Sequence, residues 1–479
     1  MKNIIQKITR MPIILGLQII ASFMFIFFLL KLGALPMLYA CILIAIICLL
    51  DIGLFFLMKN DQSDSTKTIV SKVISIVISV LLLIGSFYIA KGDSTLNSIS
   101  GADKDTYTYS VIVKKESEIK DVKDLTQQKI AMNMQEDIQY FTKALSALKE
   151  ENNSFESLEV NDFHQLAKDL YDNQCDAIFV NVAYLTMLET DYENFNEDTR
   201  VVWSYSIDKK LEDFSKDVDV VSKPFVIYIS GIDTFGKVST ISRSDVNMIV
   251  TINPKTKQIL MTSIPRDYYV TLDNKGKKDK LTHSGLAGIE NTVKTVEKFM
   301  GIDINYYARV NFTSLIQMVD ALGGIEVESI EDFSIGQYHY VKGMNQLNGD
   351  QALYFARARY TVTGGDNGRV ANQQRVLTGM LKKMMSPAIL TNYTGVLNSI
   401  EGCFETNMQS SEITSLIQMQ LNDMASWTFT TKQLIGTGAM LTGGAYIPGR
   451  KLYYMLPNET SVKENKAAIQ SVLDGKSIQ

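Results

Sequence analysis

The sequence predicts an α/β protein whose main domain is a mixed sheet with helices on both faces, preceded by a small α/β accessory domain and three transmembrane helices. Three observations predict this architecture. Long apolar runs fill the first part of the chain. The next part alternates short β-branched runs with amphipathic segments, and the last part repeats that alternation over a greater length. We therefore divide the chain into a membrane region (1–92), an accessory domain (104–221) and a larger domain (222–479).

The three apolar runs are long enough to cross a membrane as helices. They cover residues 12–30, 35–58 and 69–90, and a helix needs about 20 apolar residues to span the hydrocarbon core. A cleaved signal peptide has one short apolar stretch, so three successive runs argue against one. Asp51 lies inside the second run, where a carboxylate is costly. Because it is near the end of that run, we expect it at the membrane interface.

The basic residues around the runs predict the orientation, since cytoplasmic loops are enriched in Lys and Arg. One group precedes the first run or surrounds the second loop: Lys2, Lys7, Arg10, Lys59, Lys67 and Lys72. The other side of the membrane has only Lys31 and Lys91 close to the runs. We expect a multi-pass protein of the cell membrane with a cytoplasmic N-terminus. The chain after residue 90 would then form a large extracellular C-terminal region.

Composition and motifs exclude several classes of function. The net charge is −5, which makes nucleic acid an unfavourable partner. Cys41 and Cys48 lie in an apolar run, and Cys175 and Cys403 are far apart, so no disulfide framework is indicated. Neither a phosphate-binding Gly-rich loop ending in Lys-Ser/Thr nor a Gly-x-Ser-x-Gly elbow is present. The three histidines are too widely spaced for a zinc set.

The accessory domain is expected to contain strands and amphipathic helices in a βαβ rhythm. The predicted strands are 107–113, 129–132 and 175–180, and the predicted helices are 137–149 and 163–173. The stretches DVKDLTQQKIAMN and LYDNQCDAIFVN resemble one lobe of an extracellular solute-binding domain. No catalytic set is visible here, and we expect His164 to be structural or to face solvent.

The larger domain repeats the alternation with longer elements. Its predicted strands are 225–230, 246–252, 259–264 and 306–312. Its predicted helices are 291–300, 313–321, 351–359 and 369–385, the second of them ending at Gly323 and Gly324. His283 precedes the first of these helices and could act as a base, but we expect it to cap that helix.

Charged residues collect near the ends of these strands and on two of the helices. Five arginines form the set: Arg243, Arg266, Arg357, Arg359 and Arg369. Gln373 lies one helical turn past the last of them and shares its face. Arginine presents a planar fork that matches two phosphate oxygens, and strand ends of α/β sheets commonly form the ligand crevice. The alternative is a set of separate surface arginines in ion pairs.

Two aspartates accompany the arginines. Asp233 follows the first predicted strand of the larger domain, and Asp245 precedes the second. Carboxylates beside a phosphate-binding fork favour a hard divalent cation, because Mg²⁺ prefers oxygen ligands shared between protein and phosphate. The sequence therefore predicts a magnesium–pyrophosphate site, with Mn²⁺ as the other cation.

Five stretches between residues 226 and 377 resemble the LytR-CpsA-Psr family and occur in the family's order: SRSDVNMIVTINPKTKQILMTSIPRD, KLTHSGLAG, VNFTSLIQMVDALGGIEVE, LNGDQALYFARAR and GDNGRVANQQRVL. Three apolar segments followed by an extra domain resemble its streptococcal capsule-associated (CpsA-like) branch. Asn372 departs from the pattern, since many members have a basic residue before the Gln pair.

The resemblance implies that residues 222–479 are the catalytic domain of a phosphotransferase at the outer membrane face. Such enzymes move a glycopolymer, such as capsular polysaccharide, from a polyprenyl-pyrophosphate carrier in the membrane lipid to peptidoglycan. By matched motif, Asp233 and Asp245 would hold Mg²⁺ or Mn²⁺. The pyrophosphate would contact Arg243, Arg266, Arg357, Arg359, Arg369 and Gln373.

Catalysis is assigned by the same resemblance to Arg243, Arg266 and Asp245, with the lipid tail in an apolar tunnel of the domain. Phosphoryl transfer needs positioning and charge stabilisation more than covalent chemistry. No general base stands out; Asp245 and Asp267 are candidates, and metal activation is the alternative.

Two other functions remain open on sequence alone. One is a membrane regulator of capsule expression, although the cytoplasmic segments are short and contain no DNA-binding motif. The other is a polyprenyl-pyrophosphate phosphatase or binding module that uses the same site without an acceptor. Product analysis with and without peptidoglycan distinguishes these possibilities.

Overall fold

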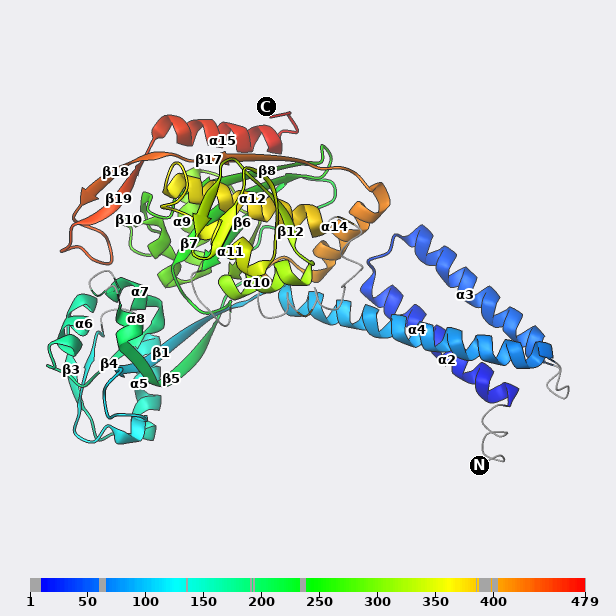
Figure 1. The fold of residues 1–479 in the computed structure, drawn as a ribbon, viewed down its shortest axis with the longest axis horizontal. Helices are drawn as coiled ribbons and strands as arrows, with labels where there is room; N and C mark the ends of the chain where they lie inside the picture. Colours follow the sequence, from blue (N-terminus) through cyan, green and yellow to red (C-terminus); the bar gives the residue numbers. More distant parts are fainter. Residues whose placement is uncertain are drawn as a thin grey trace.

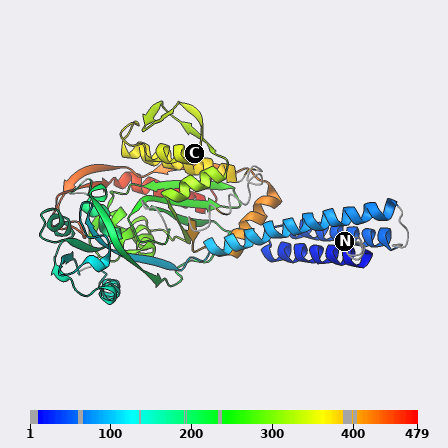
Figure 2. The same cartoon turned by 60° about the horizontal axis from the view of Figure 1, so that its bottom comes forward.

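The computed structural model describes residues 10–59, 66–134, 137–189, 192, 194–232, 238–384, 386, 398 and 404–478. Figure 1 shows three parts: a group of long helices, a small α/β unit and a larger α/β unit. Figure 2 shows the long helices projecting away from both α/β units.

Within the described residues, three helices are long and apolar enough to cross a membrane: α2 (Met11–Leu32), α3 (Met37–Met58) and α4 (Thr66–Ile99). Their 22, 22 and 34 residues cover the three predicted runs, except for the first two residues of the second run. At 1.5 Å per residue α4 is about 51 Å long, well beyond the roughly 30 Å of hydrocarbon. Its C-terminal part therefore extends past the apolar bundle, where Asp93 pairs with Lys31 of α2 at 2.7 Å.

A polar cluster connects the three apolar helices to one another. Gln18 of α2 donates to Asp51 Oδ1 of α3 at 2.9 Å and accepts from Ser79 Oγ of α4 at 2.8 Å. Asp51 is seven residues before the end of α3, about 10 Å along the helix. The Gln18 amide thus holds Asp51 against α2, and the expected position of Asp51 at the membrane interface stays a prediction.

The accessory unit is a five-stranded sheet of order β3-β2-β4-β1-β5. Its strands are β1 (Lys104–Lys114), β2 (Lys129–Met132), β3 (Glu156–Glu159), β4 (Ala177–Asn181) and β5 (Thr199–Lys210). The predicted helices appear as α5 (Ile138–Glu151) and α6 (Phe163–Tyr171). Strands β3 and β5 were not expected, since the apolar alternation in both is weak and most of their side chains are exposed or half-buried.

The larger unit is built on a six-stranded mixed sheet of order β16-β11-β6-β7-β8-β17. Its strands are β6 (Phe225–Ile232), β7 (Ser244–Asn253), β8 (Gln258–Ile264), β11 (Tyr306–Asn311), β16 (Phe404–Thr406) and β17 (Thr428–Gln433). The pairs β11–β6 and β17–β8 are parallel, and β6–β7 and β7–β8 are antiparallel. The predicted mixed sheet is confirmed.

Helices cover both faces of this sheet, as predicted. On one face, Ile249 and Leu260 join a core that includes residues of α9 (Ile289–Met300) and α15 (Glu459–Leu473). The opposite face presents Met248 and Met261 to a separate core that Leu377 of α12 (Asp366–Met384) joins. Alternate residues of one strand serve the two faces because successive side chains point in opposite directions.

A satellite core lies beyond α12. It packs α12 against α10 (Phe312–Ala321), α11 (Gly349–Arg357) and two small sheets, β12–β15 and β13–β14. These four strands are β12 (Ile325–Ser329), β13 (Phe333–Ile335), β14 (Tyr338–Tyr340) and β15 (Gly343–Leu347). Gly323 and Gly324 end α10 with positive φ, as expected. Helix α11 stops at Arg357, so the prediction that Arg359 lies on it is wrong: Arg359 belongs to the connection to α12.

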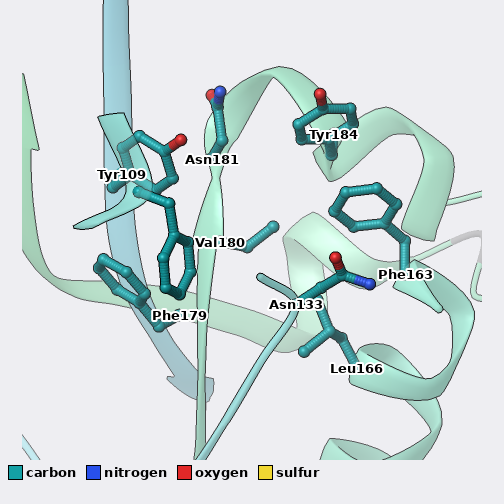
Figure 3. A pocket seen from close by; sticks show the side chains of 9 residues that line it. Tyr109, Asn133, Phe163, Leu166, Phe179, Val180, Asn181 and Tyr184 are labelled. Carbon is teal, nitrogen blue, oxygen red and sulfur yellow. The ribbon is translucent and has the colours of Figure 1, made fainter. Parts of the chain in front are cut away.

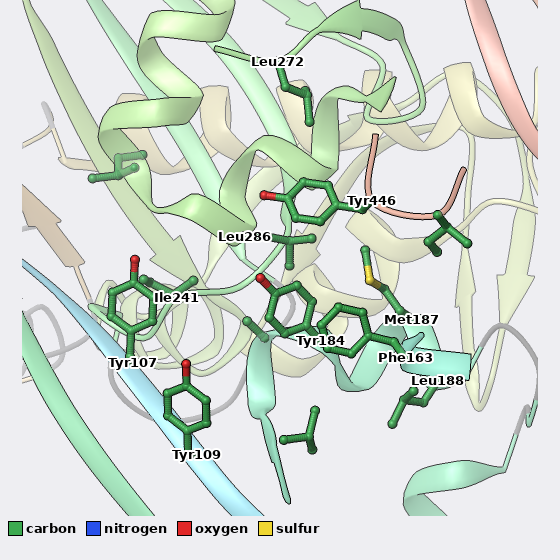
Figure 4. Packing of buried hydrophobic residues seen from close by; sticks show 14 of the residues in the cluster. Tyr107, Tyr109, Phe163, Tyr184, Met187, Leu188, Ile241, Leu272, Leu286 and Tyr446 are labelled. Carbon is green, nitrogen blue, oxygen red and sulfur yellow. The ribbon is translucent and has the colours of Figure 1, made fainter. Parts of the chain in front are cut away.

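The two α/β units share one continuous apolar core. Figure 4 shows Tyr184, Met187 and Phe163 of the accessory unit packed beside Leu286 and Tyr446 of the larger unit. The Tyr184 and Tyr446 rings are 6.3 Å apart between centroids. His164 receives a hydrogen bond from Arg450 at 2.7 Å, and burial followed by the Arg450 charge lowers its pKa. His164 is therefore a structural contact between units.

A buried arginine reinforces this junction. Arg309 of β11 donates to Asp105 of β1, to Glu405 of β16 and, at 2.9 Å, to the Lys104 carbonyl. Its side chain is 3% exposed. Gly288 lies directly over Asp105, where any Cβ would clash with the carboxylate. The accessory unit is thereby fixed to the segment that leads into α9.

Candidate active site

The candidate site lies at one edge of the six-stranded sheet. Strand β6 ends there at Ile232, β7 begins there with Ile232 paired to Ser244, and β8 ends there with Asn247 paired to Ile264. This antiparallel course brings Asp245, the second residue of β7, beside Arg266, which follows β8. Asp233, the predicted second metal ligand, lies outside the described residues.

Asp245 is the centre of the site. Its Oδ1 accepts from Arg266 Nη1 at 3.0 Å and from Thr282 Oγ1 at 3.0 Å, while Arg243 Nη2 is 3.6 Å from its Oδ2. The side chain is 11% exposed. Burial disfavours its charge, but the charges of Arg243 and Arg266 and the Thr282 hydrogen bond outweigh burial and lower the pKa of Asp245. A carboxylate with a lowered pKa is a weak base and a good ligand for cations.

A second acid continues the charge chain from Arg266. Asp267 Oδ2 is 3.8 Å from Arg266 Nε, and its Oδ1 is 3.0 Å from Lys280 Nζ. Burial opposes the Arg266 charge, yet the attraction of Asp245, Asp267 and Asp366 outweighs it and raises the pKa of Arg266. Arg266 is therefore a permanent cation at the sheet edge.

Helix α12 contributes the other wall of the site. Asp366, its first residue, is 2.5 Å from Arg369 Nη2 and 3.6 Å from Arg359 Nε. The preceding Gly364 and Gly365 have φ of +87° and +58°, a conformation that favours glycine, and it turns the chain from α11 into α12. Burial and the nearby Arg266 charge lower the pKa of Arg369, a sign that the two guanidinium groups are close.

The polar atoms of this cluster are incompletely satisfied. Six of them are buried and make no hydrogen bond to any described residue: Arg243 Nε, Arg266 Nε, Arg369 Nε, Asp245 Oδ2, Asp366 Oδ1 and Asp366 Oδ2. Leaving a buried donor or acceptor without a partner costs about 1–3 kcal/mol each. Three donors and three acceptors gathered at one edge are typical of a site shaped for an anion and a cation together.

Two predicted residues have a less central position. Arg357, the last residue of α11, is exposed. Gln373 is half-buried on α12, one turn beyond Arg369 as expected. Its neighbours Asn372 and Gln374 are buried and donate to the carbonyls of Phe355 and Lys432. Asn372, where the family pattern departs, therefore anchors α12 to α11.

Asp366 and Thr282 belong to the site but were not predicted. Asp366 was visible in the sequence as an acid three residues before Arg369, a helical spacing that permits an ion pair. Thr282 gave no such signal, because it reaches Asp245 only through η3 (Leu281–Ala287).

His283, the neighbour of Thr282, is buried and shares a 2.9 Å hydrogen bond with Asp279. The expected capping role of His283 is wrong, because Gly288 is the N-cap of α9.

A divalent cation fits the donor chemistry of this site. Asp245 Oδ2 makes no hydrogen bond within the described part of the chain. Nowhere in that part do three His, Cys, Asp or Glu side chains gather as a metal set. Mg²⁺ is commonly held by one or two carboxylates plus substrate phosphate oxygens, so a set supplied by protein alone is not required.

The accessory unit contains a separate small hollow. It lies between Tyr109, Phe163, Asn181 and Tyr184 (Figure 3). Its volume is about 10 Å³, which is room for a single water molecule. The sheet edge of the larger unit, by contrast, adjoins a pocket of about 380 Å³ that Arg359 and Asp366 line.

Known proteins resemble the larger unit. The model of the LytR_cpsA_psr family matches residues 189–470. A "polyisoprenyl-teichoic acid–peptidoglycan teichoic acid transferase TagU" of Bacillus cereus is 38% identical over 202 residues, 42% of this chain and 65% of the relative. The protein of that name from Enterococcus faecalis is 34% identical over 251 residues, 51% of this chain and 82% of the relative.

Solved structures also match. The crystal structure of Bacillus subtilis TagU is 30% identical, with a TM-score of 0.43, covering 54% of this chain and all of that one. The chain spans 65% of the length of the Bacillus cereus relative. Since the family model covers more than half of the residues, the chain belongs to the LytR-CpsA-Psr family.

Proposed function

We propose that this protein transfers a glycopolymer from a polyprenyl-pyrophosphate carrier to peptidoglycan, outside the cell. The observation that carries the proposal is the buried cluster of Arg243, Arg266 and Arg369 around Asp245 and Asp366, in which six buried polar atoms make no hydrogen bond to the described chain. The names of the relatives, teichoic acid–peptidoglycan transferases, support the same reaction class. The polymer is a teichoic acid, a capsular polysaccharide or a similar chain.

The proposed reaction replaces a phosphoanhydride bond with a phosphoester bond. A sugar hydroxyl of peptidoglycan attacks the phosphorus that bears the glycopolymer, and the bond from that phosphorus to the bridging oxygen breaks. The products are a phosphodiester and polyprenyl phosphate. The three arginines orient the pyrophosphate and stabilise the charge that develops on its oxygens. A bound Mg²⁺ would supply further charge compensation there, with Asp245 as a ligand.

The hydroxyl proton needs an acceptor other than Asp245. With a lowered pKa and two arginine partners, Asp245 binds a proton poorly. Asp267 is held by Lys280 and Arg266. Asp366 lines the open pocket; Arg369 and Arg359 lie against its Oδ1, whereas its Oδ2 has neither a hydrogen bond nor an ion pair within the described chain. We therefore favour Asp366 as the proton acceptor.

The fold supports a substrate that arrives from the membrane. Helix α14 (Ser410–Asp423) contacts the turn between α2 and α3, where Gln418 donates to the Gly33 carbonyl. The larger unit thus rests against the end of the membrane bundle, within reach of a lipid-linked substrate. The positive-inside pattern puts this end outside the cell.

The test is a transfer assay with the purified full-length protein. A short-chain lipid-pyrophosphate glycan and soluble peptidoglycan strands are incubated with wild type, Arg266→Ala or Arg369→Ala. Removing a charge-assisted contact to the transferred group should lower transfer about 10²–10³-fold. Arg375→Ala, on the same helix as Arg369 but paired with Asn372, is the control and should keep wild-type transfer.

Product analysis decides between the related functions. Phosphodiester-linked glycan that forms only with peptidoglycan supports transfer, and phosphate release without acceptor dependence would make the protein a phosphatase. Normal transfer by both site variants would refute the arginine assignment.

The location is tested by labelling. Asn274→Cys adds a thiol to a loop of the larger unit, and an impermeant maleimide should label it in intact cells, above the background of wild type. Labelling that requires cell lysis would reverse the proposed orientation.

A further inference from the structure

The pocket beside the arginine cluster has features that the phosphate chemistry does not use. It lies between the connection from α11 to α12 and a hairpin formed by β18 (Gly436–Leu441) and β19 (Leu452–Pro457). Its volume of about 380 Å³ is in the range of small-molecule sites. Arg359 and Asp366 form one wall, which joins the pocket to the site described above.

Two tyrosines present aromatic surface to this pocket. Tyr360 is 91% exposed and lies beside Arg359, whose guanidinium is 5.3 Å from the ring centroid. Tyr453 is 39% exposed on β19. Burial, then the charges of Asp267 and Asp366, raise the pKa of Tyr453, which therefore remains a neutral hydroxyl near the acids. Tyr360 buries little of its ring on folding, and tyrosine is enriched at binding surfaces.

Glycines set the position of Tyr453. A Cβ on Gly438 would lie 2.8 Å from the Tyr453 ring, and one on Gly436 would lie 2.7 Å from the Met455 side chain. The Tyr453 ring consequently lies across the glycine backbone of β18. The hairpin presents this aromatic face together with the backbone of Gly436 and Gly438 and with Met455.

Polar groups complete the lining. Asp366 Oδ1 is ion-paired with Arg369 at 2.5 Å, whereas its Oδ2 is buried and has no partner in the part of the chain that the structure describes. Asn367 accepts from Gln433 at 2.9 Å, which fixes its amide at the pocket wall. One carboxylate oxygen without a partner, an oriented amide and two aromatic faces match a ring that has hydroxyls at its edge and C–H groups on its face.

We infer that this pocket binds a sugar ring next to the transferred phosphate. The inference rests on the proposed function, since the pocket shares Arg359 and Asp366 with the pyrophosphate site. The ring could belong to the first sugar of the lipid-linked donor or to the peptidoglycan acceptor. The chemistry of recognition is the same for both, and the experiment distinguishes them.

The experiment uses the full-length protein in lipid nanodiscs and three probes. These are a lipid pyrophosphate bearing a disaccharide, the same lipid pyrophosphate without sugar, and soluble peptidoglycan strands. The variants are Tyr360→Ala, Tyr453→Ala, Tyr453→Phe and Gly438→Ala. Tyr205→Ala, an accessory-unit tyrosine with 41% exposure, is the matched control.

Tyr360→Ala and Tyr453→Ala should weaken sugar recognition about tenfold. A donor pocket raises Kd for the sugar-bearing lipid, and an acceptor pocket raises KM for the strands. Kd for the sugarless lipid should stay within about twofold of wild type in either case. Tyr453→Phe keeps the ring and should restore most binding, whereas Gly438→Ala displaces the ring and should imitate Tyr453→Ala.

The outcomes separate this inference from the proposed function. If both alanine variants keep wild-type Kd for the disaccharide lipid and wild-type KM for the strands, the sugar pocket is refuted. If wild type binds no lipid pyrophosphate, the proposed function fails. Direct binding of soluble strands to wild type and to the tyrosine variants then still tests the pocket, and equal binding by all of them would refute it.

Discussion

Two buried arginine clusters in this chain differ in how completely their polar atoms are satisfied. At the junction of the two α/β units, all three nitrogen groups of Arg309 donate hydrogen bonds, to Glu405, Asp105 and the Lys104 carbonyl. At the sheet edge, by contrast, Arg243, Arg266 and Arg369 each keep a buried Nε that has no hydrogen-bond partner among the described residues.

The difference teaches how a structural charge cluster is told from a functional one. A buried ion pair is tolerable only when hydrogen bonds satisfy the remaining donors and acceptors. The Arg309 cluster approaches that condition and leaves one oxygen, Asp105 Oδ2, without a described partner. The sheet-edge cluster leaves six atoms, and it places two mutually repelling arginines together. Such an arrangement costs stability unless a ligand completes it.

The largest expected effect on folding is at the junction. Arg309→Ala leaves Asp105 and Glu405 buried without their cation, which should cost about 3–5 kcal/mol of unfolding free energy. Denaturant unfolding of the full-length protein in detergent measures it. Lys294→Ala, which breaks an exposed pair with Glu290, is the control and should cost under about 1 kcal/mol.

Arg369→Ala makes the comparison direct. It removes an arginine whose side chain is 13% exposed from the other cluster, relieves repulsion by Arg266 and leaves Arg359 beside Asp366, so its stability cost should be smaller than that of Arg309→Ala. An Arg369→Ala variant that unfolds as readily as Arg309→Ala would remove the distinction between the clusters.

Cation dependence gives the next largest effect. Transfer should stop in chelator and return with Mg²⁺, and Asp245→Asn should raise the Mg²⁺ concentration for half-maximal transfer at least about tenfold, or 1.4 kcal/mol. Asp233→Asn tests the other predicted ligand. Full activity in chelator, or an unaltered Mg²⁺ requirement in both variants, would exclude these carboxylates as metal ligands.

The membrane bundle offers a third, polar cluster for comparison. Gln18→Leu removes the hydrogen bonds to Asp51 and Ser79, and interhelical hydrogen bonds in membranes contribute about 0.6 kcal/mol on average and up to about 2. Unfolding of the full chain by SDS titration should shift by that amount. Leu17→Ala on the same helix, 46% exposed, should shift it less. A larger shift for Leu17→Ala would show that apolar packing outweighs the polar cluster.

The smallest effect is a difference in titration between the clusters. Burial raises the pKa of Glu405 despite Arg309, whereas the arginines lower that of Asp245. Protonation of Glu405 therefore stabilises the folded state, and this stabilisation is complete below the pKa of an unfolded glutamate, near 4.3. The stabilisation is lost as pH rises through the pKa that Glu405 has in the folded protein. The contribution of Asp245 is complete above about pH 3.9 and is lost as pH falls through its lowered value.

Infrared difference spectra measure this order. During acidification, the carbonyl band of protonated Glu405 should appear at a higher pH than that of Asp245. The bands are assigned by their loss in Glu405→Gln and Asp245→Asn. Simultaneous appearance, or the reverse order, would contradict the assigned environments.

Much of the fold was predictable because its elements have strong periodic patterns. The first two apolar runs, strands β6, β7 and β8, and helix α12 were all expected within a few residues, whereas α4 continues to Ile99, beyond the end of its apolar run at residue 90. Elements with weak patterns were not: β5 has mostly exposed or half-buried side chains, and the strand assignment comes from pairing with β1. The end of α11 was misplaced by two residues, since the turn at Gly364 and Gly365 redirects the chain.

The sequence by itself determined the site's chemistry: which arginines and acids are available, and that strand ends would gather some of them. Only the tertiary structure decided which of them meet. Asp245 and Arg266 are 21 residues apart and become neighbours because β7 and β8 run antiparallel. Thr282 joins them because the short helix η3 brings it next to Asp245. Arg357 stays at the surface, at the end of its helix. Long-range proximity depends on chain reversal and packing, which local patterns do not encode.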